Sequence, residues 1–402
     1  MPSIETLTPD AGRVDAEALR AVDAESLADC AVDRTEPWWR RLACARALAG
    51  RVPRSRLDGL LGCVRAEDDT GSVRVALLDV LGDREELLPW LRHEDRAEEG
   101  AYGMKEAVFT ARGRLGDLTA AAGLAELAFS PWRHRRDTGD AGLDALVARH
   151  GTAKVLAALD DTRPEVRAWR VRLRHRAGED VTDALADPDH GVAHLAQDLI
   201  TDPDRLRDHL RGAPTDEAAL WAAYALHRLT GDAAETRAVY EALGRPRVEV
   251  AGLTEDVRRA VVHEYAPECE KQSDPRWRVE AVCTEPPDPV DEEAQLRRAA
   301  RALAAAGLEP APPVSCGDAH RQGGGTYHVI GYRDGREVFI STLGPYAGDH
   351  GDDPEARAAL EAAGFRWIDA AQGGVAVTGL HVYYFGAREP LDVHTLLFYW
   401  QD

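Results

Sequence analysis

Arginines in the middle of the chain follow the spacing of a single helix face. They are Arg163, Arg167, Arg170 and Arg174. Steps of four, three and four residues would place all four side chains in one stripe along an α-helix. The planar guanidinium group binds carboxylates and phosphates through paired hydrogen bonds. The spacing therefore predicts a surface that binds an acidic peptide, a phosphoryl group or a nucleic-acid backbone.

This stripe belongs to a basic segment of an acidic chain. Residues 131–176 contain eleven Lys and Arg residues against six Asp and Glu residues. A second group of arginines, next to a tryptophan, would extend the stripe sideways from the preceding helical pair. The predicted binding residues are Trp132, Arg133, Arg135, Arg136, Arg163, Arg167, Trp169, Arg170 and Arg174. In the alternative interpretation, Arg167 pairs with aspartates of neighbouring turns and the tryptophans pack in the core. Arg172 and Arg176 lie off the stripe, which favours this alternative.

The sequence patterns assign no catalytic residue. Gly-x-Ser-x-Gly, Gly-x-x-x-x-Gly-Lys-Ser/Thr and His-Glu-x-x-His are all missing from the sequence. The six cysteines form no Cys-x-x-Cys pair, and Gly323-Gly324-Gly325 precedes a predicted strand, whereas a phosphate loop must open a helix. We therefore expect no metal and no cofactor. An enzymatic activity of the C-terminal part stays open.

Histidines and tyrosines of the C-terminal part fall on predicted strands. They are His328, His381, His394, Tyr327, Tyr383, Tyr384 and Tyr399. Because side chains alternate across a strand, Tyr327 and Val329 should lie on one face and Ile330 and Tyr332 on the other. These residues either line a pocket for a small ligand or peptide, or occupy ordinary half-buried strand positions.

An internal repeat indicates which elements position the arginines. Residues 159–167 and 185–193 align without a gap at a spacing of 26 residues, and residues 68–74 repeat the turn with one residue fewer. Each copy reads as a Leu that ends a helix, a turn, and a Val near the start of the next helix. Helical pairs of this length cannot bury their apolar faces alone, so they stack. We predict an α-solenoid of helical pairs over residues 1–245.

This region resembles the HEAT-like repeats of the phycobilisome-lyase type. The matching segments run from Asp69 to Arg74 and from Asp161 to Arg167, and Ala/Leu-rich helices close on Gly-Asp. The resemblance implies a solenoid fold, but this repeat occurs in scaffolds, lyases, inhibitors and regulatory subunits alike. The glycines at 82, 116, 178 and 231 are expected to end helices in the left-handed conformation.

The C-terminal third has a different pattern. Residues 246–275 are predicted to be a helical or linker transition, and residues 276–402 a small α+β domain with a mainly antiparallel sheet. Asp334-Gly335 marks a hairpin, and Asp353 is expected to cap a helix that begins at Pro354. The predicted strands are Trp277–Cys283, Thr326–Tyr332, Glu337–Leu343, Val375–Phe385 and Val393–Trp400, and the predicted helices are Asp291–Ala306 and Pro354–Gly364.

Charge and composition limit the functional classes. The formal net charge of −21 repels polyanions and membranes of like charge and favours basic partners. The first residues contain no basic segment followed by an apolar one, and no stretch is apolar enough to span a bilayer. We therefore expect a cytoplasmic protein with reduced cysteines and no membrane partner.

These observations favour a non-catalytic scaffold or regulatory module that binds a protein partner through the solenoid surface, with the arginine stripe as the anchor. One alternative is a nucleic-acid-binding protein, because Trp132 and Trp169 among arginines resemble the cleft of helical-repeat alkylpurine DNA glycosylases; the net charge disfavours it. The other alternative is an immunity-like or antitoxin-like inhibitor of a basic protein.

Overall fold

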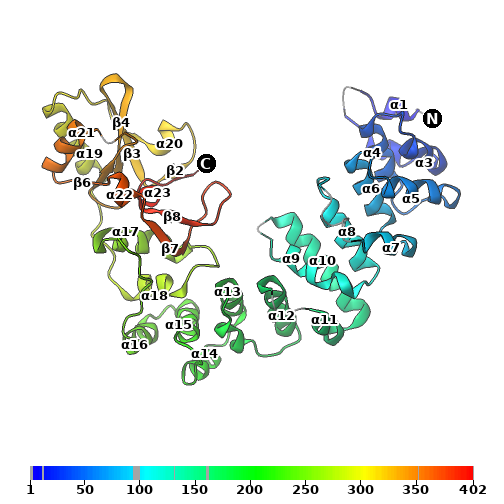
Figure 1. Cartoon of the computed structure of the whole chain (residues 1–402), viewed down its shortest axis with the longest axis horizontal. Helices are drawn as coiled ribbons and strands as arrows, with labels where there is room; N and C mark the ends of the chain where they lie inside the picture. Colours follow the sequence, from blue (N-terminus) through cyan, green and yellow to red (C-terminus); the bar gives the residue numbers. More distant parts are fainter. Residues whose placement is uncertain are drawn as a thin grey trace. The chain divides into compact units, whose positions relative to one another are not determined.

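The computed structural model describes residues 3–10, 13–93, 100–130, 132–159, 163–351 and 353–401 (Figure 1). The chain forms two compact units, Met1–Glu179 and Asp180–Asp402. The first unit consists of packed helices, and the second adds a mixed, mostly antiparallel sheet to further helices. The prediction of a helical N-terminal part followed by an α+β part is confirmed. The domain boundaries at 245 and 275 stay predictions.

The first unit is built from short helices in succession, coloured blue to green in Figure 1. Acidic and hydroxyl side chains at the helix starts, such as Asp23 before α3, accept hydrogen bonds from unpaired backbone N–H groups. Its helices are α1 (Ile4–Leu7), α2 (Ala16–Leu19), α3 (Ala24–Val32), α4 (Trp38–Ala47), η1 (Arg54–Arg56), α5 (Leu57–Arg65), α6 (Gly71–Leu81), η2 (Glu85–Leu87), α7 (Leu88–Leu91), α8 (Met104–Arg114), η4 (Leu118–Ala120), α9 (Ala121–Ala128), α10 (Arg133–His150), α11 (Thr152–Ala158) and α12 (Pro164–Arg176).

Ion pairs about one repeat apart in sequence join successive helices of the first unit. Arg41 contacts Asp69 28 residues later, and Arg135 contacts Glu106 29 residues earlier. Arg172 and Arg176 of α12 contact carboxylates of α10, in both cases 32 residues earlier. Their partners, Asp140 and Asp144, are spaced by four residues like the arginines themselves, so α10 and α12 lie side by side and run in the same direction.

A buried arginine makes the same contact in three helices. The side chains belong to α4, α6 and α17 (Glu255–Tyr265), and their residues are 3, 1 and 6% exposed. Each guanidinium donates a hydrogen bond of 2.8–3.0 Å to the backbone carbonyl ten residues earlier. The pairs are Arg41 with Ala31, Arg74 with Val64 and Arg258 with Val248. Because a buried guanidinium must find acceptors, this contact ties each helix to the segment before it.

The second unit begins with a succession of short helices. One hydrophobic cluster of these helices joins Leu220 and Tyr224 to Tyr240 and Val279. These helices are η5 (Thr182–Ala186), α13 (His190–Leu199), α14 (Pro203–Leu210), α15 (Asp216–Thr230), α16 (Ala234–Ala242), α17, η6 (Ala266–Glu268) and α18 (Pro275–Cys283).

A five-stranded sheet follows, in the order β1-β3-β4-β5-β6. All neighbours are antiparallel except β5 and β6, and the β3–β4 hairpin turns at Asp334 and Gly335 as predicted. Two small ribbons pair β2 with β9 and β7 with β8. The strands are β1 (Val314–Ser315), β2 (Gly324–Gly325), β3 (Tyr327–Tyr332), β4 (Arg336–Ser341), β5 (Tyr346–Gly348), β6 (Arg366–Trp367), β7 (Ala376–His381), β8 (Pro390–Asp392) and β9 (Trp400–Gln401). The helical segments among them are α19 (Glu292–Ala305), α20 (Cys316–Ala319), η7 (Arg333–Gly335), α21 (Pro354–Ala362), α22 (Ala370–Gly373) and α23 (Val393–Leu397).

Both faces of this sheet are buried, and the predicted alternation along β3 is confirmed. Ile330 and Tyr332 pack with α19 and α21 on one face. Tyr327 and Val329 pack on the other face, in a core shared with α17, α18 and α23. In Figure 1, α19 and α21 lie beside β3 and β4, away from α23. The shared core fixes the end of α17 against the sheet region.

The structure corrects several local predictions. Trp277–Cys283 is not a strand but part of helix α18. The Asp274 carboxylate caps the helix start by accepting from the Arg276 N–H, and the side chain of Trp277 is fully buried. Val393–Trp400 is helix α23 followed by β9. Glycines 116, 178 and 231 have the predicted positive φ, but Gly82 has a φ of −67°. Residues 160–162, which carry part of the repeat motif, lie outside the described residues.

Candidate functional site

The predicted arginine stripe lies on α12 in the first unit. Its members are half-buried, with Arg163 at the N-cap and the other three on the helix. The adjacent stripe of Val166, Trp169 and Leu173 is buried in the core, as expected for one face of an amphipathic helix. The structure therefore places the arginines along one side of α12.

Carboxylates accompany these arginines. Arg163 contacts Glu126 at the end of α9 over 3.4 Å, and the Nε of Arg174 contacts Glu179 over 3.3 Å. Arg167 and Arg170 also have interaction partners. The pairing of Arg172 and Arg176 with α10 agrees with the interpretation that arginines off the stripe join neighbouring repeats. Ion pairing thus lowers the positive charge of this surface.

The start of α10 exposes an arginine and a tryptophan of the basic region. The Arg133 side chain is 87% exposed, and that of its ion-pair partner Asp137 is 71% exposed. Trp132, at the N-cap, is 58% exposed. Arg135 contacts Glu106 over 2.6 Å, and Arg136 donates to the carbonyl of Ser130 over 3.0 Å. Trp132 and Arg133 are therefore the predicted residues best placed to touch a partner.

Trp169 has a different role from Trp132. Its residue is 1% exposed, its indole N–H donates to Asp140 over 3.1 Å, and the Arg176 guanidinium lies 5.5 Å from its ring centroid. A tryptophan packed in this way holds α12 against α10. The expectation that repeat tryptophans serve packing describes Trp169, whereas Trp132 stays on the surface.

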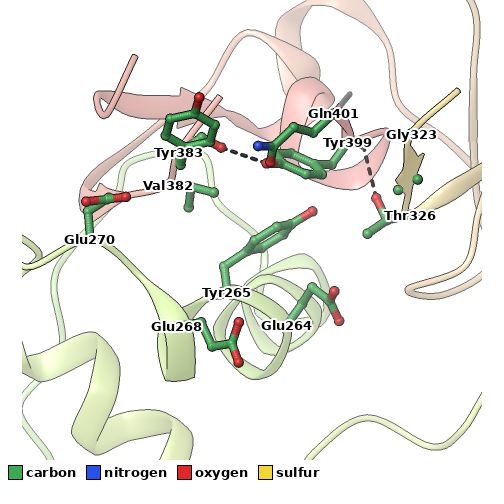
Figure 2. Close-up of a pocket in the computed structure, with 12 residues that line it drawn as sticks. Glu264, Tyr265, Glu268, Glu270, Gly323, Thr326, Val382, Tyr383, Tyr399 and Gln401 are labelled. Atoms are coloured by element: carbon green, nitrogen blue, oxygen red, sulfur yellow. Dashed lines mark hydrogen bonds between the residues drawn. The ribbon is translucent and has the colours of Figure 1, made fainter. Parts of the chain in front are cut away.

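The second unit contains a cleft of about 660 Å³ between α17 and the C-terminal strands (Figure 2). The end of α17 and η6 form its lower wall. The β2–β9 ribbon and the segment after β7 form the opposite wall. The lining residues are Glu264, Tyr265, Glu268, Glu270, Gly323, Gly324, Gly325, Thr326, Val382, Tyr383, Tyr399 and Gln401. A cleft of this size encloses a small organic molecule or a few peptide residues.

Hydrogen bonds hold the tyrosines of the cleft in place. The Tyr265 hydroxyl donates to the Leu396 carbonyl over 2.5 Å, and the Tyr399 hydroxyl donates to the Tyr383 carbonyl over 2.6 Å. The Gln401 amide also contacts the Tyr399 hydroxyl. That hydroxyl has one proton, which the Tyr383 carbonyl and the Gln401 side-chain oxygen share as acceptors. Burial raises the pKa of Tyr265, so this phenol stays neutral and acts through its ring.

Three glutamates give the cleft its charge. Glu270 contacts the Nε of Arg388 over 3.1 Å, and the Arg388 guanidinium lies 5.2 Å from the Tyr383 ring centroid. Glu264 and Glu268 project from the lower wall (Figure 2). Burial, followed by repulsion from the Glu268 carboxylate, raises the pKa of Glu264. The lower wall therefore carries concentrated negative charge.

Only part of this cleft can be recognised from the amino-acid sequence. Tyr383 and Tyr399, which were candidates for a tyrosine-lined pocket, do line it, and so does Gly323-Gly324-Gly325. Tyr383 nevertheless lies beyond the end of β7. The glutamates were missed; the available signal was the four-residue spacing of Glu264 and Glu268, which places like charges on one helical face.

A third group brings His190, Glu217 and Asp274 together, with candidate ligand atoms within 4.8 Å of one another. Each residue stands at the start of a helix, where partial positive charge favours carboxylates. Asp274 already accepts hydrogen bonds from Arg276 at 2.5 and 2.9 Å. Helix ends and a guanidinium oppose a bound cation, so helix capping and ion pairing account for this group.

None of the helices within the described ranges combines the length and the apolar composition needed to span a bilayer. Comparisons with protein-family models, curated proteins and solved structures gave no match to this chain. Its functional assignment therefore depends on the chemistry of the two surfaces described above.

Proposed function

We propose that this chain is a non-catalytic protein-binding module whose helical part consists of HEAT-like helical pairs and whose basic surface binds an acidic segment of a partner. The repeated contact of Arg41, Arg74 and Arg258 with the carbonyl ten residues earlier supports the repeat assignment. Ion pairs one repeat apart support it further. Stacked repeats of this kind present long surfaces to partners.

The charge of α10 and α12 is the observation that carries the binding proposal. Together these two helices contain nine arginines against four Asp and Glu residues, in a chain with a net charge of −21. Among the described residues, Glu106 and Glu179 also contact arginines of these helices, and Glu126 contacts Arg163 at the N-cap of α12. An acidic segment is the occupant that such a surface attracts.

The exposed pair at the start of α10 supplies the contact chemistry. Trp132 offers a large apolar surface, and Arg133 offers a guanidinium that can form paired hydrogen bonds with a carboxylate. Tryptophan and arginine are the residue types that most often dominate binding energy at protein interfaces. We therefore place the centre of the interface at the start of α10, with the α12 stripe beside it.

The test compares the full chain with a Trp132→Ala/Arg133→Glu variant in affinity capture, followed by titration of the purified captured partner. The control is Arg211→Glu. Arg211 is 71% exposed, pairs with Asp208, and lies far from Trp132 and Arg133 in the sequence. We expect the control to retain an acidic partner and the variant to bind it at least about tenfold more weakly, with affinity falling as salt rises.

Equal binding by variant and control would contradict the proposed interface. Recovery of nucleic acid instead of protein, with a steep salt dependence, would favour the nucleic-acid-binding alternative. Recovery of a basic protein would favour the inhibitor alternative. Thermal unfolding of the variant should match that of the original chain, because both replaced side chains are exposed.

A further inference from the structure

We propose that the cleft of the second unit binds an organic cation, an ammonium or guanidinium group carried on a flexible chain. This site is independent of the proposed protein-binding surface, because every residue that lines the cleft belongs to the second unit. One wall carries carboxylates without a cationic partner among the described residues, aromatic rings lie beside it, and a carboxylate and a ring hold an arginine at the rim of the same cleft.

The lower wall concentrates negative charge at a helix end. Glu264 lies in the last turn of α17, and Glu268 follows four residues later in η6. No hydrogen bond or ion pair from the described residues reaches either carboxylate. The C-terminus of a helix carries partial negative charge, which adds to the repulsion between the two groups. A cation in the cleft would relieve both effects.

Aromatic rings make an organic cation a better fit than a bare metal ion. The rings of Tyr265 and Tyr399 meet edge to face, with centroids 5.7 Å apart, and Tyr265 points into the space between the two walls (Figure 2). Their hydroxyls are engaged with backbone carbonyls, so the rings are what remains for a ligand. Tyrosine rings attract ammonium and guanidinium groups, whereas divalent ions require several oxygen ligands.

One of the protein's own arginine side chains is already held between a carboxylate and a tyrosine ring. Arg388 contacts the carboxylate of Glu270 over 3.1 Å and lies over the Tyr383 ring, and both of those residues line the cleft. Glu264 and Tyr265 offer the same combination of carboxylate and ring on the lower wall. A ligand amine at the lower wall would therefore meet the same combination of carboxylate and ring that Arg388 meets at the rim.

The aromatic surface continues beyond the cleft. Tyr384 contacts both Tyr399 and Phe385, and Phe385 contacts Trp400 with ring centroids 5.0 Å apart. Phe385 is 47% exposed and has a φ of +45°, a conformation that is strained for a bulky side chain. An exposed aromatic side chain at this position would cover the aliphatic part of a ligand whose charged end lies in the cleft.

The same ligand chemistry has two sources, a free polyamine and the basic side chains of a peptide, and titration calorimetry on the full chain separates them. Spermidine and a tri-arginine peptide are the probes, and 1,8-octanediol is the uncharged control. We expect one or both cations to bind and the diol not to bind. Binding of spermidine alone would identify a polyamine site, and binding of the peptide alone would identify a peptide site.

Variants test the two carboxylates. Glu264→Gln/Glu268→Gln should weaken binding of the cation at least about tenfold, since it removes two charges from the site. The matched control, Glu249→Gln/Glu309→Gln, removes two exposed charges outside the cleft and should bind like the original chain. Circular dichroism and thermal unfolding establish that each variant is folded.

Three results would overturn the proposal. They are failure of both cations to bind, equal binding by the cleft variant and the control variant, and tight binding of Ca²⁺ or Mg²⁺ that spermidine does not displace. A pH titration gives a second readout on the unmodified chain. Affinity should fall on acidification and begin to do so at a higher pH than an ordinary glutamate would give, because the pKa of Glu264 is raised.

Discussion

Arg258 and Glu280 form a two-pronged ion pair in the interior of the second unit. Arg258 Nε donates to Oε1 over 2.8 Å and Nη2 donates to Oε2 over 2.6 Å, and the side chains are 7 and 3% exposed. The guanidinium also lies 4.4 Å from the ring centroid of Trp277. Because Arg258 belongs to α17 and Glu280 to α18, the pair fixes the helix whose end forms the lower wall of the cleft.

Glu280→Gln is expected to lower the free energy of unfolding by about 3–5 kcal/mol, because it leaves a buried guanidinium without its counter-charge. Urea unfolding followed by tryptophan fluorescence measures the change. The matched control is Glu241→Gln, which breaks the exposed pair with Arg245 and should cost no more than about 1 kcal/mol. An effect of Glu280→Gln no larger than the control would contradict the assigned role of the pair.

Asp117 gives the first unit a predictable response to acid. Burial alone would raise the pKa of this carboxyl, but hydrogen bonds from Arg92, Thr119 and Arg112 outweigh burial and hold the pKa at about 2. A pKa below that of the unfolded chain means that the ionised carboxylate stabilises the fold. This contribution, about 2 kcal/mol, is complete above about pH 4 and is lost as the pH falls toward 2.

Asp117→Asn should therefore reduce stability at pH 7 and lose this disadvantage between pH 4 and 2. Urea unfolding at several pH values measures the difference between the two proteins. Asp137→Asn serves as the control, because Asp137 is 71% exposed and its ion pair with Arg133 spans 3.7 Å. A stability difference that stays constant from pH 7 to pH 2 would show that the charge of Asp117 is not the cause.

Arg41 tests the recurring buried contact. Arg41→Met removes both hydrogen bonds from Arg41 to Asp69. The Asp69 side chain is 2% exposed, and the next arginine, Arg34, lies 3.8 Å away, so the variant leaves a buried carboxylate without a close cation. We expect a loss of about 3 kcal/mol or more. Arg133→Met, at an 87% exposed side chain, should change stability by less than about 0.5 kcal/mol. Similar losses of stability in the two variants would contradict the proposal that the buried contacts of Arg41 stabilise the fold.

The sequence predicted elements whose signals are local. The Asp334-Gly335 hairpin and the Asp353 cap before Pro354 depend on turn and capping residues next to each other in the chain, and both predictions are confirmed. Trp277–Cys283 was wrong as a strand, since a short apolar run fits a buried helix as well as a strand. The cap at Asp274 was the signal that distinguishes the two.

The cleft could not be predicted because its walls are far apart in sequence. Glu264 and Tyr399 are separated by 135 positions, and they line one cavity because the core shared by α17 and the sheet brings them together. The ion pairs of the basic surface could not be predicted from the sequence either. The sequence shows arginine spacing, but the contact of Arg163 with Glu126 depends on how α12 packs against α9.

Glu264→Gln separates binding from stability at the cleft. The pKa of Glu264 is raised in the folded protein, so the stability linked to this group is present at low pH and is lost as the pH rises through the folded pKa. At pH 7 the variant should be as stable as the original chain or slightly more stable, by less than about 1 kcal/mol, because the residue as a whole is exposed and only its carboxylate is partly desolvated in the cleft. Melting temperatures from pH 4 to pH 8 measure this, and a lower melting temperature of the variant at pH 7 would contradict it. Spermidine should reverse the order at pH 7, because a ligand that binds only the folded state stabilises the protein that binds it more tightly.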